Sequence, residues 1–488
     1  MGFGATPQKR KEQNMRKTKI VCTLGPASDS PEMIKKLIDC GMNVARLNFS
    51  HGTHESHQTV IDTFKKVRKE SGQPVALLLD TKGPEIRIGT FKDNMRPFLE
   101  RGELFTLTTR EVEGDENCVS ISCKELPGQL KESTKVLIDD GRIELCVEKL
   151  DKNDIVCRVV HGGEVSSRKG INIPYTHIDM PYLSDNDKAD LVFGIENDVD
   201  FIAASFVRKK EDVIELRKFL NYHGGHSIKI ISKIENMEGV ENFDEILEHS
   251  DGIMVARGDM GVEIEYEKLP GIQKKFIRRC YSAGKMVITA TQMLESMVKS
   301  PTPTRAEITD VANAVFDGTS AVMLSGETAM GAHPARVVKV MSKIVSQAEE
   351  DYFDMNMSFI GGHDVDTKDK TNAICDAACT TARDLKAKAI IAVTKSGETA
   401  RRVSKFRPYE KIVAATPEVK TFYQLALSWG VYPVLALNQD DEERLFLHAI
   451  DCAKQIDAVS TGDTVVITAG IPLGMPGTTN LLKVDTVK

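Results

Sequence analysis

Short apolar, β-branched runs alternate with amphipathic helical stretches up to about residue 350 of the chain. Each run is apolar on both faces, as buried parallel strands are, and helical patterns lie between most of them. The eight runs are Lys19–Leu24, Asn43–Leu47, Val75–Leu79, Phe201–Phe206, Ile228–Ile234, Gly252–Ala256, Met286–Thr289 and Thr319–Leu324. Strands and helices in this alternation predict an α/β fold of the (β/α)8 TIM barrel type, built from residues 17–83 and 181–350.

One connection in this series is far too long for a strand-to-helix loop. About a hundred residues separate the third run from the fourth, and they contain β-rich stretches of their own, LFTLTTR, CVSISCK, KVLIDD, IELCVEKL and DIVCRVVHGG. We therefore expect a small separate β domain over 84–180, carried on the loop after the third strand. Since loops after barrel strands face the active site, this domain is placed to act as a lid.

The alternation restarts in the last part of the chain with AIIAVT, KIVAAT, VYPVLAL and TVVITAG. These strands, with helices between them, predict a third domain over 351–488 with a doubly wound α/β sheet. The polar segment DMNMSFIGGHDVDTKDK suits the linker, and residues 1–16 form a polar, basic tail.

Bulk composition narrows the kinds of partner. A chain of 488 residues with a net charge of −7 lacks the basic surface that nucleic acid requires. No stretch is apolar for long enough to span a membrane, and the N-terminus has no secretory pattern. The ten cysteines are scattered, without a C-x-x-C pair, as expected of reduced thiols. We expect a cytoplasmic protein that binds neither nucleic acid nor membrane.

Polar and ionisable residues stand at or just after the ends of seven of the eight runs, where a barrel of this type places its active site. They are Arg46, Asn48, Ser50, Asp80, Thr81, Lys82, Ser205, Lys233, Glu235, Arg257, Gly258, Asp259, Thr291, Ser325 and Glu327. A single Asp after a strand is more often a helix N-cap. Capping alone does not explain seven strands that end in this way, so we interpret the set as one site.

The chemistry of these residues suits phosphoryl transfer. Strand alternation puts Lys233 and Glu235 on one side, where they could also be a structural salt bridge. Asp259 arrives from the neighbouring strand, and two carboxylates suit Mg²⁺. Lys233 and Arg46 supply positive charge for a phosphoryl group in transit. Gly258 would let a bound anion approach backbone N–H groups at a helix start.

Two further sequence features bear on a P-loop kinase and on a histidine metal site. No G-x-x-x-x-G-K-[ST] loop is present, which excludes a P-loop kinase. His51, His54 and His57 have a spacing reminiscent of metal ligands. Because a third ligand at that spacing drifts off the helix face, we favour a role without metal.

The strings at the strand ends resemble the pyruvate kinase family over nearly the whole chain. They are KIVCTLGPAS, ARLNFSHG, LDTKGPEIR, SRKGIN, ISKIEN, MVARGDMGVE, TATQMLESM, PTRAEITDVANAV and VMLSGETA. The resemblance implies a TIM barrel with an inserted small β-barrel domain, a C-terminal α/β domain and a homotetramer. It further implies an enzyme that transfers a phosphoryl group from phosphoenolpyruvate to ADP, giving pyruvate and ATP with Mg²⁺ and K⁺.

The resemblance also implies roles for individual residues. The catalytic and substrate-binding residues would be Arg46, Lys233, Gly258, Asp259, Thr291 and Ser325, the last two beside the water chain that delivers a proton to the enolate. Mg²⁺ would be held by Glu235 and Asp259, and K⁺ by Asn48, Ser50, Asp80 and Thr81. The nucleotide would face Asn48, His51, Arg87 and Lys169. Glu85 resembles the K⁺-dependent members, whereas a lysine there resembles the K⁺-independent ones.

The C-terminal domain carries a candidate effector site. The residues Thr394, Lys395, Ser396, Gly397 and Thr399 lie between a predicted strand and helix, where hydroxyls, a lysine and N–H groups can cradle phosphate. In the family this loop binds a phosphorylated effector, here a sugar phosphate or AMP, although a plain capped loop is the alternative. Glu398 is not a residue that an anion site needs. The later segment AGIPLGMPGTTN resembles bacterial members.

Two other functions remain open. A phosphoenolpyruvate-binding aldolase or lyase could use the same barrel, but the inserted domain with Arg87 and Lys169 argues against it. A barrel that has become a binding or structural protein would have lost its charged residues at the strand ends, and all of them are present.

Overall fold

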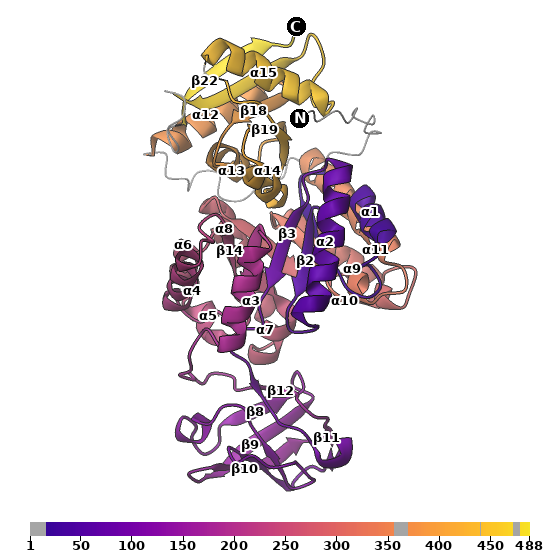
Figure 1. Cartoon of the computed structure of the whole chain (residues 1–488), viewed down its shortest axis with the longest axis vertical. Helices are drawn as coiled ribbons and strands as arrows, with labels where there is room; N and C mark the ends of the chain where they lie inside the picture. The colour runs from indigo at the N-terminus through magenta and orange to yellow at the C-terminus, as the bar shows by residue number, and fades with distance from the viewer. Residues whose placement is uncertain (1–15, 356–368, 440, 472–478) are drawn as a thin grey trace.

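The computed structural model describes residues 16–355, 369–439, 441–471 and 479–488. The predicted tail up to residue 15, the linker residues 356–368 and the part of AGIPLGMPGTTN at 472–478 lie outside the described residues. Figure 1 shows three bodies along the longest axis: the C-terminal domain at one end, the barrel in the middle and the inserted β domain at the other end.

Eight parallel strands close into a barrel in the order β1-β17-β16-β15-β14-β13-β3-β2. They are β1 (Lys19–Thr23), β2 (Val44–Asn48), β3 (Ala76–Asp80), β13 (Phe201–Ala204), β14 (Lys229–Ile234), β15 (Gly252–Ala256), β16 (Met286–Ala290) and β17 (Ala321–Leu324). Each predicted run overlaps one of them, which confirms the TIM barrel. The run Phe201–Phe206 exceeds its strand because the chain turns after Ala204, and Phe206 has a φ of 53°.

The runs are apolar on both faces because the barrel has two separate cores. Ile20 and Cys22 face outward and pack under the helices, whereas Val21 between them faces the barrel interior. The surrounding helices are α1 (Pro31–Cys40), α2 (His54–Ser71), α3 (Asp185–Glu196), α4 (Lys210–Tyr222), α5 (Met237–Glu241), α6 (Phe243–His249), α7 (Arg257–Glu263), α8 (Leu269–Ser282), α9 (Arg305–Phe316), α10 (Gly326–Ala329) and α11 (Pro334–Asp354). No helix in the described ranges is long and apolar enough to cross a membrane.

The inserted domain between β3 and β13 is a curled, mostly antiparallel sheet, in which only the β6–β7 pair of the described strands is parallel. Its main sheet has the order β4-β12-β8-β9-β10-β6-β7, and the bridge between Ile88 and Ile121 joins its two edge strands, so the sheet closes as a barrel does. The strands are β4 (Ile86–Arg87), β5 (Phe98–Leu99), β6 (Leu104–Thr108), β7 (Cys118–Ser120), β8 (Lys135–Ile138), β9 (Ile143–Leu150), β10 (Asp154–His161), β11 (Gly163–Glu164) and β12 (Gly170–Asn172). The domain boundaries at 84 and 180 stay predictions.

The C-terminal domain is a doubly wound sheet in the order β20-β19-β18-β21-β22. Its elements are α12 (Lys370–Asp384), β18 (Ala389–Val393), α13 (Glu398–Lys405), β19 (Lys411–Thr416), α14 (Val419–Gln424), β20 (Val431–Leu435), α15 (Glu442–Gln455), β21 (Thr464–Gly470) and β22 (Thr479–Thr486). Ile390 packs under α12 and α13, and Ile391 packs under α15 on the opposite face. The four predicted strands are present, and antiparallel β22 is an addition.

Candidate active site

The carboxyl ends of the barrel strands, here called the rim, face the inserted domain (Figure 1). Asp80 at the end of β3 is fully buried and binds two cationic side chains. Its Oδ2 accepts a hydrogen bond from Arg46 Nε at 2.6 Å, and its Oδ1 accepts one from Lys233 Nζ at 2.9 Å. The two cations predicted to hold a phosphoryl group therefore share one carboxylate.

A second carboxylate holds Lys233 from the other side. Lys233 Nζ lies 3.0 Å from Glu235 Oε1, and the other oxygen of Glu235 accepts the Phe206 N–H at 2.7 Å. This confirms that strand alternation puts Lys233 and Glu235 on one side. The positive φ of Phe206 turns its N–H toward that carboxylate.

The buried charges stabilise one another in their ionised forms. Burial alone would lower the pKa of Lys233, but Asp80 and Glu235 outweigh it and raise the pKa above the ordinary value. Burial would likewise raise the pKa of Asp80, but Arg46 and Lys233 hold it below its usual range. The two carboxylates thus hold Lys233 in its charged form.

Glu235 has less positive charge around it than Asp80, because it pairs with Lys233 whereas Asp80 pairs with both Arg46 and Lys233. Burial raises the pKa of Glu235 to about 7, with a further increase from Asp259, although Lys233 opposes it. Asp259, in the first turn of α7, is only partly buried, and its carboxylate makes no hydrogen bond or ion pair within the described part of the chain. Glu235 has one cationic partner among the described residues, Lys233, and both carboxylates have oxygen lone pairs to spare, so together they fit a hard divalent cation such as Mg²⁺.

Thr291 is braced beside the start of α7. Its Oγ accepts the N–H of Gly258 at 2.8 Å, and its carbonyl accepts Arg257 Nη2 at 2.6 Å. Arg257 is anchored in turn by Asp310 at 2.7 Å. These contacts hold Thr291 at a φ of 68°. The Gly258 N–H that we expected to meet an anion is therefore bonded to Thr291, and Arg257 supports this turn.

The proposed K⁺ ligands lie on adjacent strands, since Asn48 and Asp80 are partners in the β2–β3 register. Asn48 Oδ1 accepts the Ser50 N–H at 3.2 Å, and the Thr81 carbonyl accepts Ser205 Oγ at 2.6 Å. These neutral oxygens suit a monovalent cation. The Asp80 carboxylate is already engaged by Arg46 and Lys233, so it would contribute negative charge more than an open coordination position.

The residues expected to face the nucleotide are divided between two domains. In the inserted domain, Arg87 pairs with Glu85 at 2.6 Å, and Lys169 pairs with Asp139 at 2.8 Å. None of the described contacts joins Arg87 or Lys169 to the rim. On the barrel side, the His51 carbonyl bonds to the His57 ring at 2.8 Å. The structure does not assemble these groups into one cluster.

Ser325 follows β17 at the rim, and its N–H donates to Glu327 Oε2 at 2.7 Å. Burial raises the pKa of Glu327, which also accepts the Leu294 N–H. Ser325 and Thr291 follow neighbouring strands, so both hydroxyls lie on the same part of the rim.

The histidine cluster makes contacts of an ordinary structural kind. His54 pairs with Asp190 at 2.6 Å, and His57 stacks on Phe49 with ring centroids 4.1 Å apart.

Comparison with known proteins decides the family. The family model described as "Pyruvate kinase, barrel domain" matches residues 15–338, and "Pyruvate kinase, alpha/beta domain" matches residues 372–485. The chain belongs to the pyruvate kinase family. Curated relatives named "Pyruvate kinase" include one from Clostridium acetobutylicum, 47% identical over 97% of this chain and 100% of its own. Another, from Staphylococcus saprophyticus, is 49% identical over 97% of this chain and 81% of its own.

A solved structure supports the same assignment. A crystal structure of a pyruvate kinase from Cryptosporidium parvum superposes with a TM-score of 0.90 at 41% identity, covering 97% of both chains. The three-domain fold and the phosphotransferase class predicted for this pyruvate kinase family member are thereby confirmed. The aldolase or lyase and the non-enzymatic barrel are set aside.

The candidate effector loop follows β18 at the point where the strand order reverses, where doubly wound sheets bind ligands. Lys395 and Ser396 are exposed there, and Gly397 has a φ of 81°. The hydroxyls of Thr394 and Thr399 are used inside the fold, bonding the Gly397 N–H at 2.9 Å and Thr479 Oγ at 2.7 Å.

The presence of Glu398 in the candidate effector loop is explained by two nearby arginines. Its carboxylate pairs with Arg402 at 2.7 Å and Arg401 at 3.3 Å, and these arginines outweigh burial and lower its pKa. It neutralises two cations at the start of α13.

Two contributors to the rim had no role assigned from the sequence: Ser205 was counted only as a member of the strand-end set, and Thr23 was not predicted. Ser205 Oγ accepts Lys233 Nζ at 2.7 Å and lies 3.1 Å from Asp80 Oδ1, so it completes the buried network. Thr23 Oγ accepts Arg46 Nη1 at 2.9 Å. Ser205 entered the strand-end set because it lies near the end of an apolar run, but that position does not reveal its contacts. Thr23 lies within its run, and nothing in the sequence pattern distinguishes it.

Proposed function

We propose that the rim of this pyruvate kinase family member transfers the phosphoryl group of phosphoenolpyruvate to ADP. The observation that carries the proposal is the buried network in which Asp80 holds Arg46 and Lys233 side by side, with Glu235 beyond Lys233. Phosphoryl transfer depends mostly on positioning and on charge placed in advance, and both are provided here.

Arg46 and Lys233 bind and orient the phosphoryl group. Asp80 and Ser205 fix the position of Lys233 Nζ, so its charge is in place before the substrate arrives. Because Asp80 and Glu235 raise its pKa, Lys233 acts here as a cation and not as a proton donor. Its contribution is to stabilise negative charge on the group in transit.

Glu235 and Asp259 are the residues that would hold Mg²⁺. The fit rests on two carboxylates. Burial raises the pKa of Glu235, so a bound cation would stabilise its ionised form. The Asp259 carboxylate lacks a hydrogen-bond or ion-pair partner among the described residues. When bound, the ion supplies Lewis-acid stabilisation of phosphoryl and carboxylate oxygens. The start of α7, braced through Gly258 and Thr291, holds the substrate's carboxylate end.

Asn48, Ser50, Asp80 and Thr81 would hold K⁺ beside this site. Thr291 and Ser325 orient the water chain that carries a proton to the enolate, an assignment supported by their position on neighbouring strands. The nucleotide is held between Asn48 and His51 on the barrel and Arg87 and Lys169 on the inserted domain, which closes over the rim to bring them together.

The loop at Lys395, Ser396 and Gly397 binds a phosphorylated effector, a sugar phosphate or AMP. Its exposed lysine and its place at the switch point of the sheet support this role. The resemblance to the family further supports a cytoplasmic homotetramer. Sedimentation should give a mass of about four times the 53.9 kDa of one chain, and a monomer at assay concentration would contradict the tetramer.

A coupled assay tests the function. Pyruvate should form from phosphoenolpyruvate only when ADP, Mg²⁺ and K⁺ are all present, and the Glu85→Lys variant should relax the requirement for K⁺. Pyruvate formed without ADP would contradict phosphoryl transfer to the nucleotide. Full activity without K⁺ would contradict the monovalent site alone.

A further inference from the structure

Arg46, the residue proposed to bind the phosphoryl group, is held from two sides. Its Nε donates to Asp80 Oδ2 at 2.6 Å, and its Nη1 donates to Oγ of Thr23, at the end of β1, at 2.9 Å. Its Nη2 makes no hydrogen bond or ion pair within the described part of the chain. Asp80 supplies the opposing charge, whereas Thr23 adds a neutral contact of defined direction. The guanidinium is therefore fixed in orientation, and its Nη2 is left for a substrate.

The hydroxyl group of Thr23 is arranged to accept this hydrogen bond. Its own proton is donated to the Leu324 carbonyl, 2.9 Å away at the end of β17. A hydroxyl group has one proton to donate and two lone pairs, so the oxygen presents a lone pair to Arg46 Nη1. Thr23 is only 5% exposed. A buried hydrogen bond of this kind, with a charged donor, contributes more than one between neutral groups.

Thr23 is in turn fixed by the strand and the helix on its other side. Its hydroxyl group meets β17 at Leu324, and its carbonyl accepts the hydroxyl group of Thr328, in α10, at 2.8 Å. Ser325, proposed to orient the water chain, lies between these two residues in the sequence. Thr23 thus connects Arg46 on β2 to the turn that carries Ser325.

We propose that Thr23 is a positioning residue for the reaction, whose hydroxyl group holds Arg46 so that Nη2 meets the phosphoryl group of the substrate. Thr23 acts through Arg46 and not on the substrate itself. Displacing a positioned group by about 1 Å can lower a rate by about 10²-fold, so a single hydrogen bond that fixes a guanidinium matters. The inference rests on the proposed function, because it requires that Arg46 binds a phosphoryl group.

Steady-state kinetics of Thr23→Val test the role of the hydroxyl group. Valine keeps the size and the branched shape of threonine but cannot accept a hydrogen bond. We expect kcat/KM for phosphoenolpyruvate to fall about tenfold or more in Thr23→Val, and to stay within about threefold of wild type in Thr23→Ser, which keeps the hydroxyl group. Wild-type kcat/KM in Thr23→Val, or equal losses in the two variants, overturns the proposal. A wild type that forms no pyruvate would instead contradict the proposed function, and this inference with it.

Two inhibitors separate the phosphoryl group from the rest of the substrate. Phosphoglycolate carries a phosphoryl group and a carboxylate, whereas oxalate carries carboxylates only. Because Arg46 is assigned to the phosphoryl group, Thr23→Val should weaken competitive inhibition by phosphoglycolate about tenfold and leave inhibition by oxalate within about twofold of wild type. Equal losses for both inhibitors would show a general distortion of the rim and contradict positioning through Arg46.

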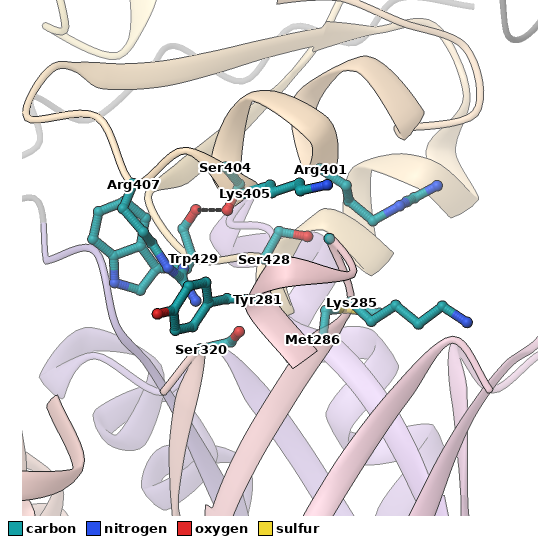
Figure 2. A pocket seen from close by; sticks show the side chains of 11 residues that line it. Tyr281, Lys285, Met286, Ser320, Arg401, Ser404, Lys405, Arg407, Ser428 and Trp429 are labelled. Atoms are coloured by element: carbon teal, nitrogen blue, oxygen red, sulfur yellow. Dashed lines mark hydrogen bonds between the residues drawn. The ribbon is translucent and has the colours of Figure 1, made fainter. Parts of the chain in front are cut away.

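A matched control removes a hydroxyl group of the same kind at the base of the barrel, the end opposite the rim. Thr319 Oγ accepts Thr289 Oγ at 2.9 Å and donates to the Ala321 carbonyl at 2.9 Å. It precedes Ser320, which in Figure 2 lies where the barrel meets the C-terminal domain. Thr319→Val should lower the free energy of unfolding about as much as Thr23→Val but leave kcat/KM unchanged. Equal losses of kcat/KM in both variants would assign the effect to stability and overturn the proposal.

Discussion

The two ends of the barrel bury lysines in opposite ways. At the rim, Lys233 lies between two carboxylates, Asp80 at 2.9 Å and Glu235 at 3.0 Å. At the base of the barrel, the end opposite the rim where the strands begin, Lys19 Nζ donates to the Val431 carbonyl at 2.7 Å and lies over the Tyr432 ring at 4.8 Å. The pKa of Lys233 is raised, whereas burial and the nearby Arg16 lower that of Lys19 to about 7.

The difference shows what each end of the barrel is suited to do. Carboxylates keep a buried cation charged, and that charge is available to a substrate. Carbonyl dipoles and aromatic rings hold a cation in place but do not replace its lost hydration, so it gives up its proton more easily. Lys17 repeats the pattern at the base: it bonds the Pro408 and Glu410 carbonyls, and burial lowers its pKa to about 8. The rim is thus organised for chemistry and the base for joining domains.

The largest effect is expected from removing the carboxylates beyond Lys233. Glu235→Ala and Asp259→Ala should each reduce Mg²⁺-dependent turnover by about a thousandfold or more, because each removes a hard oxygen ligand. The measurement is steady-state pyruvate formation over a range of Mg²⁺ concentrations. Glu267→Ala, an exposed residue beyond α7, is the control. Wild-type rates in either variant at ordinary Mg²⁺ would show that the metal lies elsewhere.

Removing Asp80 breaks the network itself. Asp80→Asn should lower the free energy of unfolding by about 3–5 kcal/mol, since it leaves Arg46 and Lys233 buried beside a neutral amide. Asp39→Asn removes one partner of the exposed pair with Lys35, 3.3 Å apart, and should cost less than about 1 kcal/mol. Urea unfolding of the two variants compares them. Similar losses would mean that burial of the rim pair has no special energetic role.

The effector loop should influence the rim only through the coupling between domains. Lys395→Glu should remove activation by a sugar phosphate or AMP, a coupling of about 1–3 kcal/mol, and leave the maximal kcat nearly intact. Saturation curves for phosphoenolpyruvate, with and without each candidate effector, measure this. Activation that survives the substitution would place the effector at another site.

The smallest effect concerns how the free energy of unfolding depends on pH because of Lys19 at the base of the barrel. Between the folded pKa of Lys19, about 7, and its ordinary value of 10.5, the unfolded chain binds a proton that the folded chain does not. Stability therefore rises with pH in that window. Lys19→Met should remove about 1–2 kcal/mol of this rise between about pH 7 and 9, with Lys17, Arg16 and Glu349 still in place.

The exposed Lys35 provides the control for this pH dependence. Lys35→Met should leave the profile of unfolding free energy against pH unchanged. An unaltered profile in Lys19→Met would show that this lysine is not deprotonated on folding.

The sequence made the barrel and its rim predictable because each buried strand leaves an uninterrupted apolar run and a polar residue where it ends. Lys233, Glu235 and Asp80 were identified in this way. The added strand β22 was not, since an edge strand such as Thr479–Thr486 is exposed on one face and its sequence TNLLKVDT has no continuous apolar run.

The features that the sequence did not predict depend on contacts between segments that are far apart in the chain. The bond from the Gly258 N–H to Thr291 and the pairing of Glu398 with two arginines depend on how elements pack, which a strand-end pattern does not specify. The junction at the base is the extreme case, because Lys17 and Lys19 meet residues about four hundred positions away in the chain. No local pattern indicated those partners.

One matched pair of variants tests the contrast between the two ends most directly. Lys233→Met and Lys19→Met remove the same group from the same barrel, one at the rim and one at the base. We expect kcat for pyruvate formation to fall by about 10²–10³ or more in Lys233→Met, the range for losing a charge donor placed in advance, and to stay near wild type in Lys19→Met. A near-normal kcat in Lys233→Met, or an equal loss in both variants, would contradict the account.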